Sequence, residues 1–331
     1  MLTGLAAIVT LLAHPGAGIV VDDSGVIYFA QGPGYRIWRL APDADAPTVL
    51  VQGVDGGDLS VPHHLVLTKN GSLYTASDRN GAVVRIEPDG DTERVFPPAD
   101  FTLSFNVGAG GDPFTIDSDG NVYCFDGSRR RTHSVLLRIS AQGEVTELAG
   151  GEIGFRDGQG GDARFGRYHG SAFAWGPNGD LFMTDAGTRV RRVTPDGRVT
   201  TIAGGEQPGF ADGPGNEARF NGAMGLAVAE SGAVYVADSG NHRIRVISPK
   251  GIVSTLAGVG ERAIRDGAVD RAAFSEPVGV AVAPDGSVCV IDVSARLRLL
   301  LVRRISPDGR VSTLTRMPEM GIPDDLPPDP E

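Results

Sequence analysis

The chain has 331 residues, a net charge of −11 and a hydrophobic content of 41%. This apolar content excludes a disordered chain, and the acidic balance makes nonspecific binding to nucleic acid or to an anionic membrane unfavourable. With 47 glycines, 22 prolines and only 6% aromatic residues, the composition indicates many turns and short strands rather than long helices.

The first 13 residues contain an apolar run that is not typical of a signal peptide, because no lysine or arginine precedes it. No stretch of the chain is long and apolar enough for a transmembrane helix, so we expect a cytoplasmic location. Residues 7–13, AIVTLLA, resemble the runs RVTTIA and IVSTLA that end later repeats. They and residues 310–315 are the two candidates for the strand that completes the last repeat.

Turn glycines spaced 46 to 59 residues apart mark six copies of one repeat. They are Gly25, Gly71, Gly120, Gly179, Gly232 and Gly286. The clearest copy, residues 218–258, contains four short runs rich in β-branched residues, namely GLAV, AVYVAD, HRIRVI and IVSTLA. Four runs in each of six copies predict an all-β fold, a six-bladed β-propeller with four antiparallel strands per blade. We expect one propeller over residues 1–316 and a solvated, proline-rich and acidic tail over 317–331.

The two cysteines, Cys124 and Cys289, form neither a metal-ligand spacing nor a disulfide framework. They lie on the second runs of the third and sixth copies, which are three blades apart. We therefore expect two free thiols on opposite sides of the ring, too far apart to form a disulfide.

Residues 235–256, YVADSGNHRIRVISPKGIVSTL, resemble the NHL repeat. Asn241 and His242 match the residues that give this motif its name, and Ile244 stands where a leucine would complete it. The linkers FRDGQGGDARF, FADGPGNEARF and IRDGAVDRAAF are similar to the connections between blades in that family. The resemblance implies that the first run of each copy is the innermost strand. It also implies that the linker entering this strand and the loop after the second run lie on one common face.

On that face, the resemblance implies that one position of each copy lines the mouth of the central channel. These positions are Ala17, His63, Asp112, His169, Met224 and Val278. Two histidines and one aspartate are typical of zinc, manganese or iron sites with open positions, whereas a single carboxylate disfavours calcium. The same side chains can also line a polar channel without any metal or catalytic role, and the sequence leaves both interpretations open.

The motifs PHH at 62–64 and YHG at 168–170 resemble the channel histidines of peptidyl-amidoglycolate lyases, propellers that hold zinc with three histidines from alternate blades. His63 and His169 match two of these histidines by position, and Val278 stands where the third is expected. This departure disfavours zinc unless Asp112 or His64 substitutes for the missing histidine.

Arginines gather in the loops that are expected on the same face. They are Arg79, Arg129, Arg130, Arg131, Arg189, Arg243, Arg296 and Arg298. Because guanidinium groups bind carboxylates and phosphates bidentately, this face could hold an anionic ligand. Alternatively, the arginines pair with loop carboxylates, as we expect for Arg243 with Asp238. The lyase resemblance implies a catalytic arginine and tyrosine, for which Arg189 and Tyr168 are candidates, with Tyr35 as a further tyrosine.

Other repeated residues are expected to be structural, because a catalytic site is normally present once whereas these residues recur by copy. Two linkers carry an Asp-Gly followed by an arginine seven residues after the aspartate, which predicts ion pairs between Asp157 and Arg164 and between Asp212 and Arg219. The last linker, with Asp266 opposite Ala273, is expected to lose this pair. The aspartates that end second runs are expected to cap turns; they are Asp126, Asp185, Asp238 and Asp292.

Two functions fit these patterns. The first is a lyase or hydrolase that acts on an anionic or carbonyl-containing small molecule at the channel mouth, by acid–base or metal-assisted chemistry. Its candidate residues are His63, Asp112, His169, Arg189 and Tyr168. The second is a non-catalytic NHL scaffold for a protein or a ligand. We expect a monomer without nucleic-acid or membrane partners.

Overall fold

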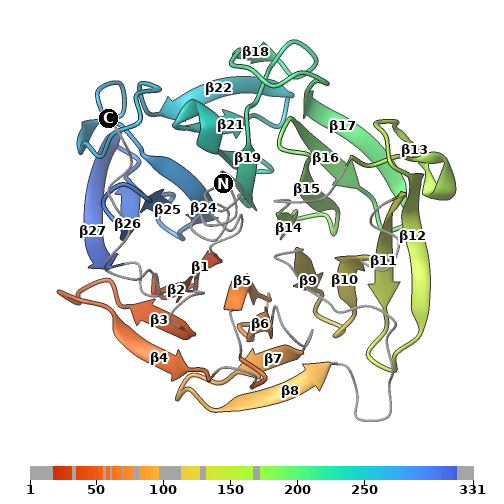
Figure 1. Cartoon of the computed structure of the whole chain (residues 1–331), viewed down its shortest axis with the longest axis horizontal. Helices are drawn as coiled ribbons and strands as arrows, with labels where there is room; N and C mark the ends of the chain where they lie inside the picture. Colours follow the sequence, from red (N-terminus) through yellow and green to blue (C-terminus); the bar gives the residue numbers. More distant parts are fainter. Residues whose placement is uncertain are drawn as a thin grey trace, which may run out of the picture.

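The computed structural model describes residues 18–31, 35–54, 57–59, 62–68, 70–77, 82–96, 113–126, 132–166 and 172–318. Six antiparallel sheets stand around a central axis as the blades of a ring (Figure 1). The described residues form no α-helix, only two short 3-10 turns, η4 (Gly160–Asp162) and η5 (Ser239–Asn241). The prediction of an all-β, six-bladed propeller is therefore confirmed.

Blades 1 to 3 each consist of four consecutive strands, the first innermost and the last outermost. Blade 1 comprises β1 (Ile19–Val21), β2 (Ile27–Gln31), β3 (Arg36–Leu40) and β4 (Thr48–Gln52). Blade 2 comprises β5 (Pro62–Leu67), β6 (Leu73–Ser77), β7 (Val83–Ile86) and β8 (Thr92–Phe96). Blade 3 comprises β9 (Phe114–Ile116), β10 (Val122–Phe125), β11 (His133–Ile139) and β12 (Val145–Glu152).

Blades 4 to 6 add a fifth strand of two residues, because the linker that enters each of them pairs with the outer edge of the same blade. Blade 4 comprises β13 (Gly158–Gln159), β14 (Phe173–Trp175), β15 (Leu181–Asp185), β16 (Arg189–Val193) and β17 (Arg198–Gly204). Blade 5 comprises β18 (Gly213–Pro214), β19 (Ala223–Val228), β20 (Val234–Asp238), β21 (Arg243–Ile247) and β22 (Ile252–Ala257). Blade 6 comprises β23 (Gly267–Ala268), β24 (Glu276–Val282), β25 (Val288–Ser294), β26 (Leu299–Ile305) and β27 (Arg310–Pro318).

A glycine in the left-handed region closes the first turn of every blade. The φ angles of Gly25, Gly71, Gly120, Gly179, Gly232 and Gly286 lie between 80° and 84°, a conformation that glycine adopts without steric penalty. In blade 5, for example, the N–H of Gly232 donates to the carbonyl oxygen of Ala229 at 2.8 Å. The glycines that mark the sequence repeat therefore mark one turn, made six times.

A bulge at one place in every outer strand gives the six blades a common register. In blade 5, Ile244 pairs with Ala257 and Arg245 with Thr255, so the outer strand carries one extra residue, Leu256, between these pairs. The third-strand residues equivalent to Arg245 are Trp38, Val84, Leu137, Arg191 and Arg303. This position is therefore uncharged in blades 1 to 3 and arginine in blades 4 to 6.

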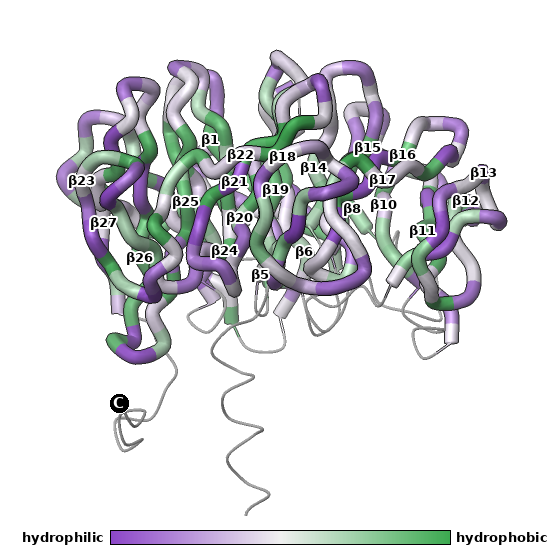
Figure 2. Tube along the Cα trace, turned by 90° about the horizontal axis from the view of Figure 1, so that it is seen from above, coloured by the Kyte–Doolittle hydropathy of each residue, from purple (hydrophilic) through white to green (hydrophobic). Residues whose placement is uncertain are grey.

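The hydrophobic core lies between neighbouring blades, where each sheet packs on the next. Six clusters of buried residues fill the six interfaces. In the cluster between blades 6 and 1, Ile27 and Phe29 pack with Ile291 and Val302. Seen from the side, hydrophobic segments gather in the strands between the two faces of the ring, and many loops on those faces are hydrophilic (Figure 2).

The last blade is completed by β27, which pairs with β26 and contains residues 310–315, one of the two candidates for this strand. The other candidate, residues 7–13, lies outside the described residues. Since β27 continues to Pro318, the ordered sheet extends two residues past the predicted end of the propeller. Cys124 and Cys289 are buried and free, in the clusters between blades 2 and 3 and between blades 6 and 1, as predicted.

Candidate functional site

A cavity of about 640 Å³ lies inside the ring. Its walls come from the innermost strands of all six blades, β1, β5, β9, β14, β19 and β24. Most of these wall residues are small or apolar. Acidic side chains, among them Asp117, Asp119 and Glu230, line the end of the cavity where the inner strands run into their first turns. The sequence predicts the functional site at the opposite end, where the inner strands begin.

The inner strand of blade 2 begins with a bulge, and both of its histidines fall in it. Pro62 pairs with Ser77, and the next pair joins Leu65 to Thr75, so His63 and His64 together lie opposite one residue of β6. Bulges re-aim side chains and are frequent next to active sites.

Blades 5 and 6 have an irregularity at the same place. In blade 5, Met224 follows the pair between Ala223 and Asp238, just before the register shifts. In blade 6, Val278 follows the pair between Pro277 and Asp292, again at the register shift. The pairing registers thus confirm that Met224 and Val278 occupy the position of His63 in their own blades.

Several predicted site residues lie outside the described residues. They are Ala17, Arg79, Asp112, Arg129, Arg130, Arg131, Tyr168 and His169. His63 belongs to β5, but its side chain is likewise outside the description. The grouping of His63, Asp112 and His169 therefore stays a prediction. Within the described ranges, no three His, Cys, Asp or Glu side chains are grouped so that they could hold a metal ion.

Met224 and Val278 make part of the predicted mouth apolar. Val278 is 1% exposed and belongs to the cluster between blades 6 and 1, against which Met224 also packs. Blade 6 therefore offers no metal ligand at the position where the lyase resemblance expects a third histidine.

Arg189 lies at the start of β16 and packs on the linker that enters its own blade. Its guanidinium carbon stands 3.8 Å from the centre of the Phe155 ring, and its Nη2 lies 3.6 Å from Oε1 of Glu206. Only 9% of the side chain is exposed. The structure thus gives Arg189 a stacking contact that the sequence did not predict.

Arg243 holds the same position in blade 5 and stacks in the same way, 4.0 Å from the centre of the Phe210 ring. Its guanidinium donates to the carbonyl oxygens of Asn241 and Val259, at 3.0 and 2.8 Å. The predicted pair between Arg243 and Asp238 is therefore wrong.

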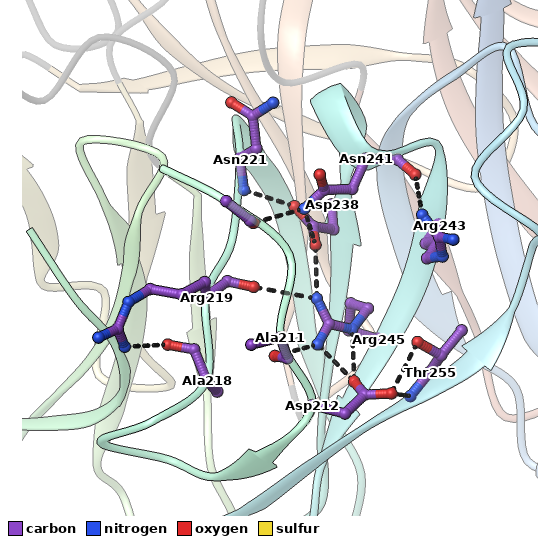
Figure 3. Close-up of polar contacts among 11 residues, drawn as sticks. Ala211, Asp212, Ala218, Arg219, Asn221, Asp238, Asn241, Arg243, Arg245 and Thr255 are labelled. Atoms are coloured by element: carbon purple, nitrogen blue, oxygen red, sulfur yellow. Dashed lines mark hydrogen bonds and ion pairs between the residues drawn. The ribbon is translucent and has the colours of Figure 1, made fainter. Parts of the chain in front are cut away.

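Asp238 pairs instead with Arg245, a fully buried arginine two residues further along β21. Nη1 of Arg245 lies 2.7 Å from Oδ2 of Asp238, and Nη2 donates to Asp212 on the other side. Asp212 accepts the N–H and the hydroxyl of Thr255, both at 3.1 Å, and Asp238 accepts the N–H of Asn221 at 2.8 Å. Figure 3 shows these contacts running from the outer strand to the start of the inner strand. We call these five residues the arginine network of blade 5.

Blades 4 and 6 contain the same network. In blade 4 it comprises Thr201, Asp157, Arg191, Asp185 and Gly166. In blade 6 it comprises Thr313, Asp266, Arg303, Asp292 and Ser275. Blades 1 to 3 have no arginine at the central position, as their registers show. The network is therefore a property of half of the ring.

The networks overturn the ion pairs that were predicted inside the linkers. Arg164 and Arg219 donate to backbone carbonyl oxygens of their own linkers, while Asp157 and Asp212 belong to the arginine networks. Asp266, which was expected to have lost its pair, lies 2.8 Å from the buried arginine of blade 6. Spacing within the linker was misleading because the true partner comes from the third strand. The available signal was an arginine repeated at one place in the third run of copies 4 to 6.

The aspartates that end the second strands of blades 4 to 6 are structural, as predicted, but each binds a buried arginine and a backbone N–H before the inner strand, and Asp238 makes no capping bond to the turn that follows it. Burial raises the pKa of Asp185 and of Asp238, and it raises the pKa of Asp292 to about 6. Guanidinium groups and backbone N–H donors oppose this effect by stabilising the charged form. In the blade 6 network the guanidinium of Arg303 lies 3.0 Å from Oδ2 of Asp292, and the N–H of Ser275 donates to the same carboxyl group.

The model of the NHL repeat matches residues 220–247, which include Asn221, Asp238 and Arg245 of the blade 5 network and the Asn-His pair at 241–242. This chain is a six-bladed β-propeller that contains an NHL repeat, and we call it the NHL propeller. The NHL propeller is 35% identical over 108 residues to the protein SUPPRESSOR OF QUENCHING 1 of Arabidopsis thaliana, covering 32% of this chain and 10% of the relative. It is 32% identical over 123 residues to NHL repeat-containing protein 2 of Homo sapiens, covering 34% of this chain and 17% of the relative. The chain thus corresponds to a small part of these relatives.

One relative matches over most of the propeller. Virginiamycin B lyase of Nocardia farcinica is 28% identical over 276 residues, covering 82% of this chain and 75% of the relative.

Solved structures share the fold at low sequence identity. A Bacteroides thetaiotaomicron protein of unknown function matches with a TM-score of 0.63 and 20% identity, over 84% of this chain and 67% of that one. A catalytically inactive histidine-to-alanine variant of Staphylococcus aureus virginiamycin B lyase, with quinupristin, matches with a TM-score of 0.55 and 14% identity, over 92% and 85%. A Xanthomonas campestris gluconolactonase matches with a TM-score of 0.55 and 11% identity, over 85% and 84%. Among the described residues of the NHL propeller, no helix is long and apolar enough to cross a membrane.

Proposed function

We propose that this NHL propeller is a lyase or hydrolase that converts a small anionic or carbonyl-containing molecule at the end of the channel where the inner strands begin. The observation that carries the proposal is the bulge in β5, which gives His63 the register position of Met224 and Val278. Three blades thus share one position at the start of the inner strand, and His169 and Asp112 are the residues that the sequence assigns to it in two further blades.

In this proposal His63 or His169 acts as general base, which suits an imidazole because its ordinary pKa is near neutral. Asp112 would orient a histidine or share a proton with it, and Tyr168 would donate a proton to the leaving group. Arg189 would supply positive charge for an anionic substrate group. Two histidines and a carboxylate also fit a divalent metal, which would polarise a carbonyl or lower the pKa of bound water.

The relative that spans most of the propeller supports an enzyme of this class. As its name states, this relative is a lyase acting on virginiamycin B, and its match covers 82% of this chain. The cavity of about 640 Å³ supports a small-molecule ligand, because binding sites of small molecules have volumes of roughly 300–1,000 Å³.

The test measures whether the purified chain and its variants turn over virginiamycin B or gluconolactone. Two enzymes of this fold are named after these compounds. His63→Ala and His169→Ala should each lower kcat/KM by at least about 100-fold, the usual effect of losing a general base. His133→Ala is the matched control, because His133 begins β11, a third strand and not an inner one, and its Nδ1 lies 2.9 Å from the hydroxyl oxygen of Thr132. Full turnover in both channel variants, or equal losses in all three, would count against the proposal.

A non-catalytic scaffold is the second candidate. It is favoured by the apolar character of Met224 and Val278 at the mouth and by the short matches to longer NHL-repeat proteins. Absence of turnover together with saturable binding of a protein partner would support this function instead.

A further inference from the structure

The cavity inside the ring has a side arm between blades 3 and 4. In the parts of the chain that the structure describes, the other four blades line the cavity only with their inner strands and the residues next to them. Blades 3 and 4, which are neighbours in the ring (Figure 1), also line it with strands further out. The residues from these strands are Tyr123, Arg138, Leu148, Leu181 and Val193. The arm lies at the end of the channel away from the predicted mouth, because Gly176 and Gly179 in the first turn of blade 4 also line it.

Two aromatic rings stand where the arm leaves the channel. The ring centre of Trp175, at the end of β14, lies 4.9 Å from that of Tyr123, with the two rings at 80° to each other. The indole N–H donates to the carbonyl oxygen of Ile116 at 3.2 Å, and the hydroxyl of Tyr123 donates to Asp117 at 3.1 Å. Since both polar groups are engaged, the rings offer apolar surface to the arm.

The aromatic residue at the end of the inner strand is a property of blade 4. The residues at the same position in the other five blades are Val21, Leu67, Ile116, Val228 and Val282. All five are aliphatic, so the pair of rings is made at one junction of the ring, the one that contains the arm.

Arg138 adds a positive charge to the arm. It pairs with Tyr123 across β11 and β10, and four other blades carry an arginine at the same position of the third strand. They are Arg39, Arg85, Arg192 and Arg304, whereas blade 5 has Val246. Each of these four arginines has a partner. Three form ion pairs with carboxylates, and Arg39 donates to the hydroxyl of Thr48 and the carbonyl oxygen of Pro88.

Arg138 differs from its four counterparts. It is exposed, and among the described residues its side chain makes no hydrogen bond and no ion pair. The arginine that lacks a partner is thus the one that lines the arm. A guanidinium group offers a planar fork of N–H donors that matches a carboxylate, so the free group suits an anionic ligand.

Carboxylates near the arm limit the charge of such a ligand. Asp117 accepts hydrogen bonds from the N–H groups of Asp119 and Asn121, from the side-chain amide of Asn121 and from the hydroxyl of Tyr123. Asp119 and Glu230 line the adjoining end of the channel and are exposed, so solvent and salt screen them in part. Their remaining field disfavours a second negative charge on a ligand.

We propose that the arm between blades 3 and 4 binds an aromatic monocarboxylate. The carboxylate of the ligand pairs with Arg138, and its ring packs on Tyr123 and Trp175, because aromatic rings associate in edge-to-face or offset geometry. Leu148 and Val193 supply apolar walls further out. This site lies at the other end of the channel from the proposed functional site and does not depend on it.

The experiment titrates the chain with phenylacetate and follows the NMR signals of the two indole N–H groups, Trp38 and Trp175, assigned by the signal lost in Trp175→Phe. Phenylacetate should shift the Trp175 signal saturably and leave that of Trp38 in place. Arg138→Gln should weaken the binding by about fivefold or more, the effect of losing a charge-assisted contact. Phenylacetamide, which lacks the charge, and phenylmalonate, which carries two, should both bind the unsubstituted chain more weakly than phenylacetate.

Two variants serve as controls. Arg85→Gln changes the arginine at the same position in blade 2, which pairs with Glu93 and does not line the cavity, and Arg189→Ala changes the predicted mouth. Both should alter the affinity for phenylacetate by less than about twofold. Absence of a saturable shift at Trp175, or equal affinities in Arg138→Gln and Arg85→Gln, would overturn the proposal. A loss of binding in Arg189→Ala alone would place phenylacetate at the mouth and overturn it as well.

Discussion

Gln31 and Pro318 are joined across nearly the whole chain: Nε2 of Gln31, at the end of β2, donates to the carbonyl oxygen of Pro318, at the end of β27, over 2.9 Å. Oε1 of the same amide accepts the indole N–H of Trp38 at 3.0 Å. Gln31 is 2% exposed, so both bonds lie at the buried junction of blades 1 and 6. One side chain thus ties the first described blade to the last strand.

We expect Gln31→Ala to lower the free energy of unfolding by about 1–3 kcal/mol, because it leaves a carbonyl oxygen and an indole N–H without their partner. Denaturant unfolding followed by tryptophan fluorescence measures the loss. Gln159→Ala is the control, since Gln159 is exposed and makes a similar amide bond to the carbonyl oxygen of Asp196. Equal losses of unfolding free energy in the two variants would mean that the bond between blades 1 and 6 stabilises the ring no more than an exposed amide bond does.

The blade 5 network predicts a large difference between two arginines. Arg245→Ala should cost about 3–5 kcal/mol, because it leaves Asp238 buried without its counter-ion. Arg94→Ala, which removes an ion pair to Asp58 between side chains that are 42% and 46% exposed, should cost less than about 1 kcal/mol. The midpoints of denaturant unfolding give the comparison, and a loss below about 1 kcal/mol for Arg245→Ala would contradict the account of the network.

The metal form of the proposed function has its own test. If His63, Asp112 and His169 hold a divalent ion, elemental analysis of the purified chain should find zinc, manganese or iron in stoichiometric amount, and a chelator should remove it together with turnover. His63→Ala and His169→Ala should lose the metal, and His133→Ala should retain it. Metal that persists in both channel variants would place the ion elsewhere.

The arginines of the predicted mouth lead to a prediction about anions. Binding of citrate, used as a probe carboxylate, should weaken with salt yet remain measurable near 0.15 M, where the screening length is about 8 Å. Arg189→Ala should weaken this binding by about tenfold or more, as expected for the loss of a charge-assisted contact. Arg310→Ala, at the start of β27, should change it by less than about twofold. Calorimetric titrations that give the same loss for both variants would mean that the arginines act only as diffuse charge.

Tyr123 gives the fold a dependence on alkaline pH. Burial raises the pKa of Tyr123 to about 12, and the hydrogen bond from its hydroxyl to Asp117, together with the negative charge of that carboxylate, adds to the effect. Because the pKa in the folded chain lies above the ordinary value of 10.0, the protonated phenol stabilises the fold below pH 10. This contribution is lost as the pH rises from about 10 to about 12.

Unfolding measured between pH 8 and pH 12 should therefore show a smaller decline of stability in Tyr123→Phe than in the unsubstituted chain. Tyr235→Phe is the control, because Tyr235 is the blade 5 counterpart of Tyr123. The turn of blade 5 has Ala229 at the position that Asp117 occupies in blade 3, so it has no carboxylate there. A decline of stability in Tyr123→Phe as steep as in the unsubstituted chain would show that Tyr123 does not cause the pH dependence.

Repeated local features made the fold predictable from the sequence. The six turn glycines fix the blade count because each needs the same positive φ, and the alignment of Met224 and Val278 with His63 survives in the strand registers. These features depend on residues that are close together in the sequence. An alignment of the six copies therefore reveals them directly.

Contacts between distant segments were not predictable in the same way. The partner of Asp212 is Arg245, 33 positions away, and not Arg219 in the same linker. Likewise, the stacking of Arg189 on Phe155 depends on the path of the linker over the blade. Spacing within a segment carries no information about which side chain of another strand faces it. The location of the candidate site stays a prediction from the sequence, and the arginine networks behind the inner strands were not predicted.

Each arginine network is complete within a single stretch of chain, from the linker aspartate to the outer-strand threonine. In blade 5 this stretch is 212–255, and in blade 6 it is 266–313. Cutting the chain between such stretches leaves each arginine of the networks with both of its aspartates. These blades can therefore be duplicated, exchanged or recombined as cassettes with their electrostatics intact, provided that each cassette begins at its linker and not at its first inner strand.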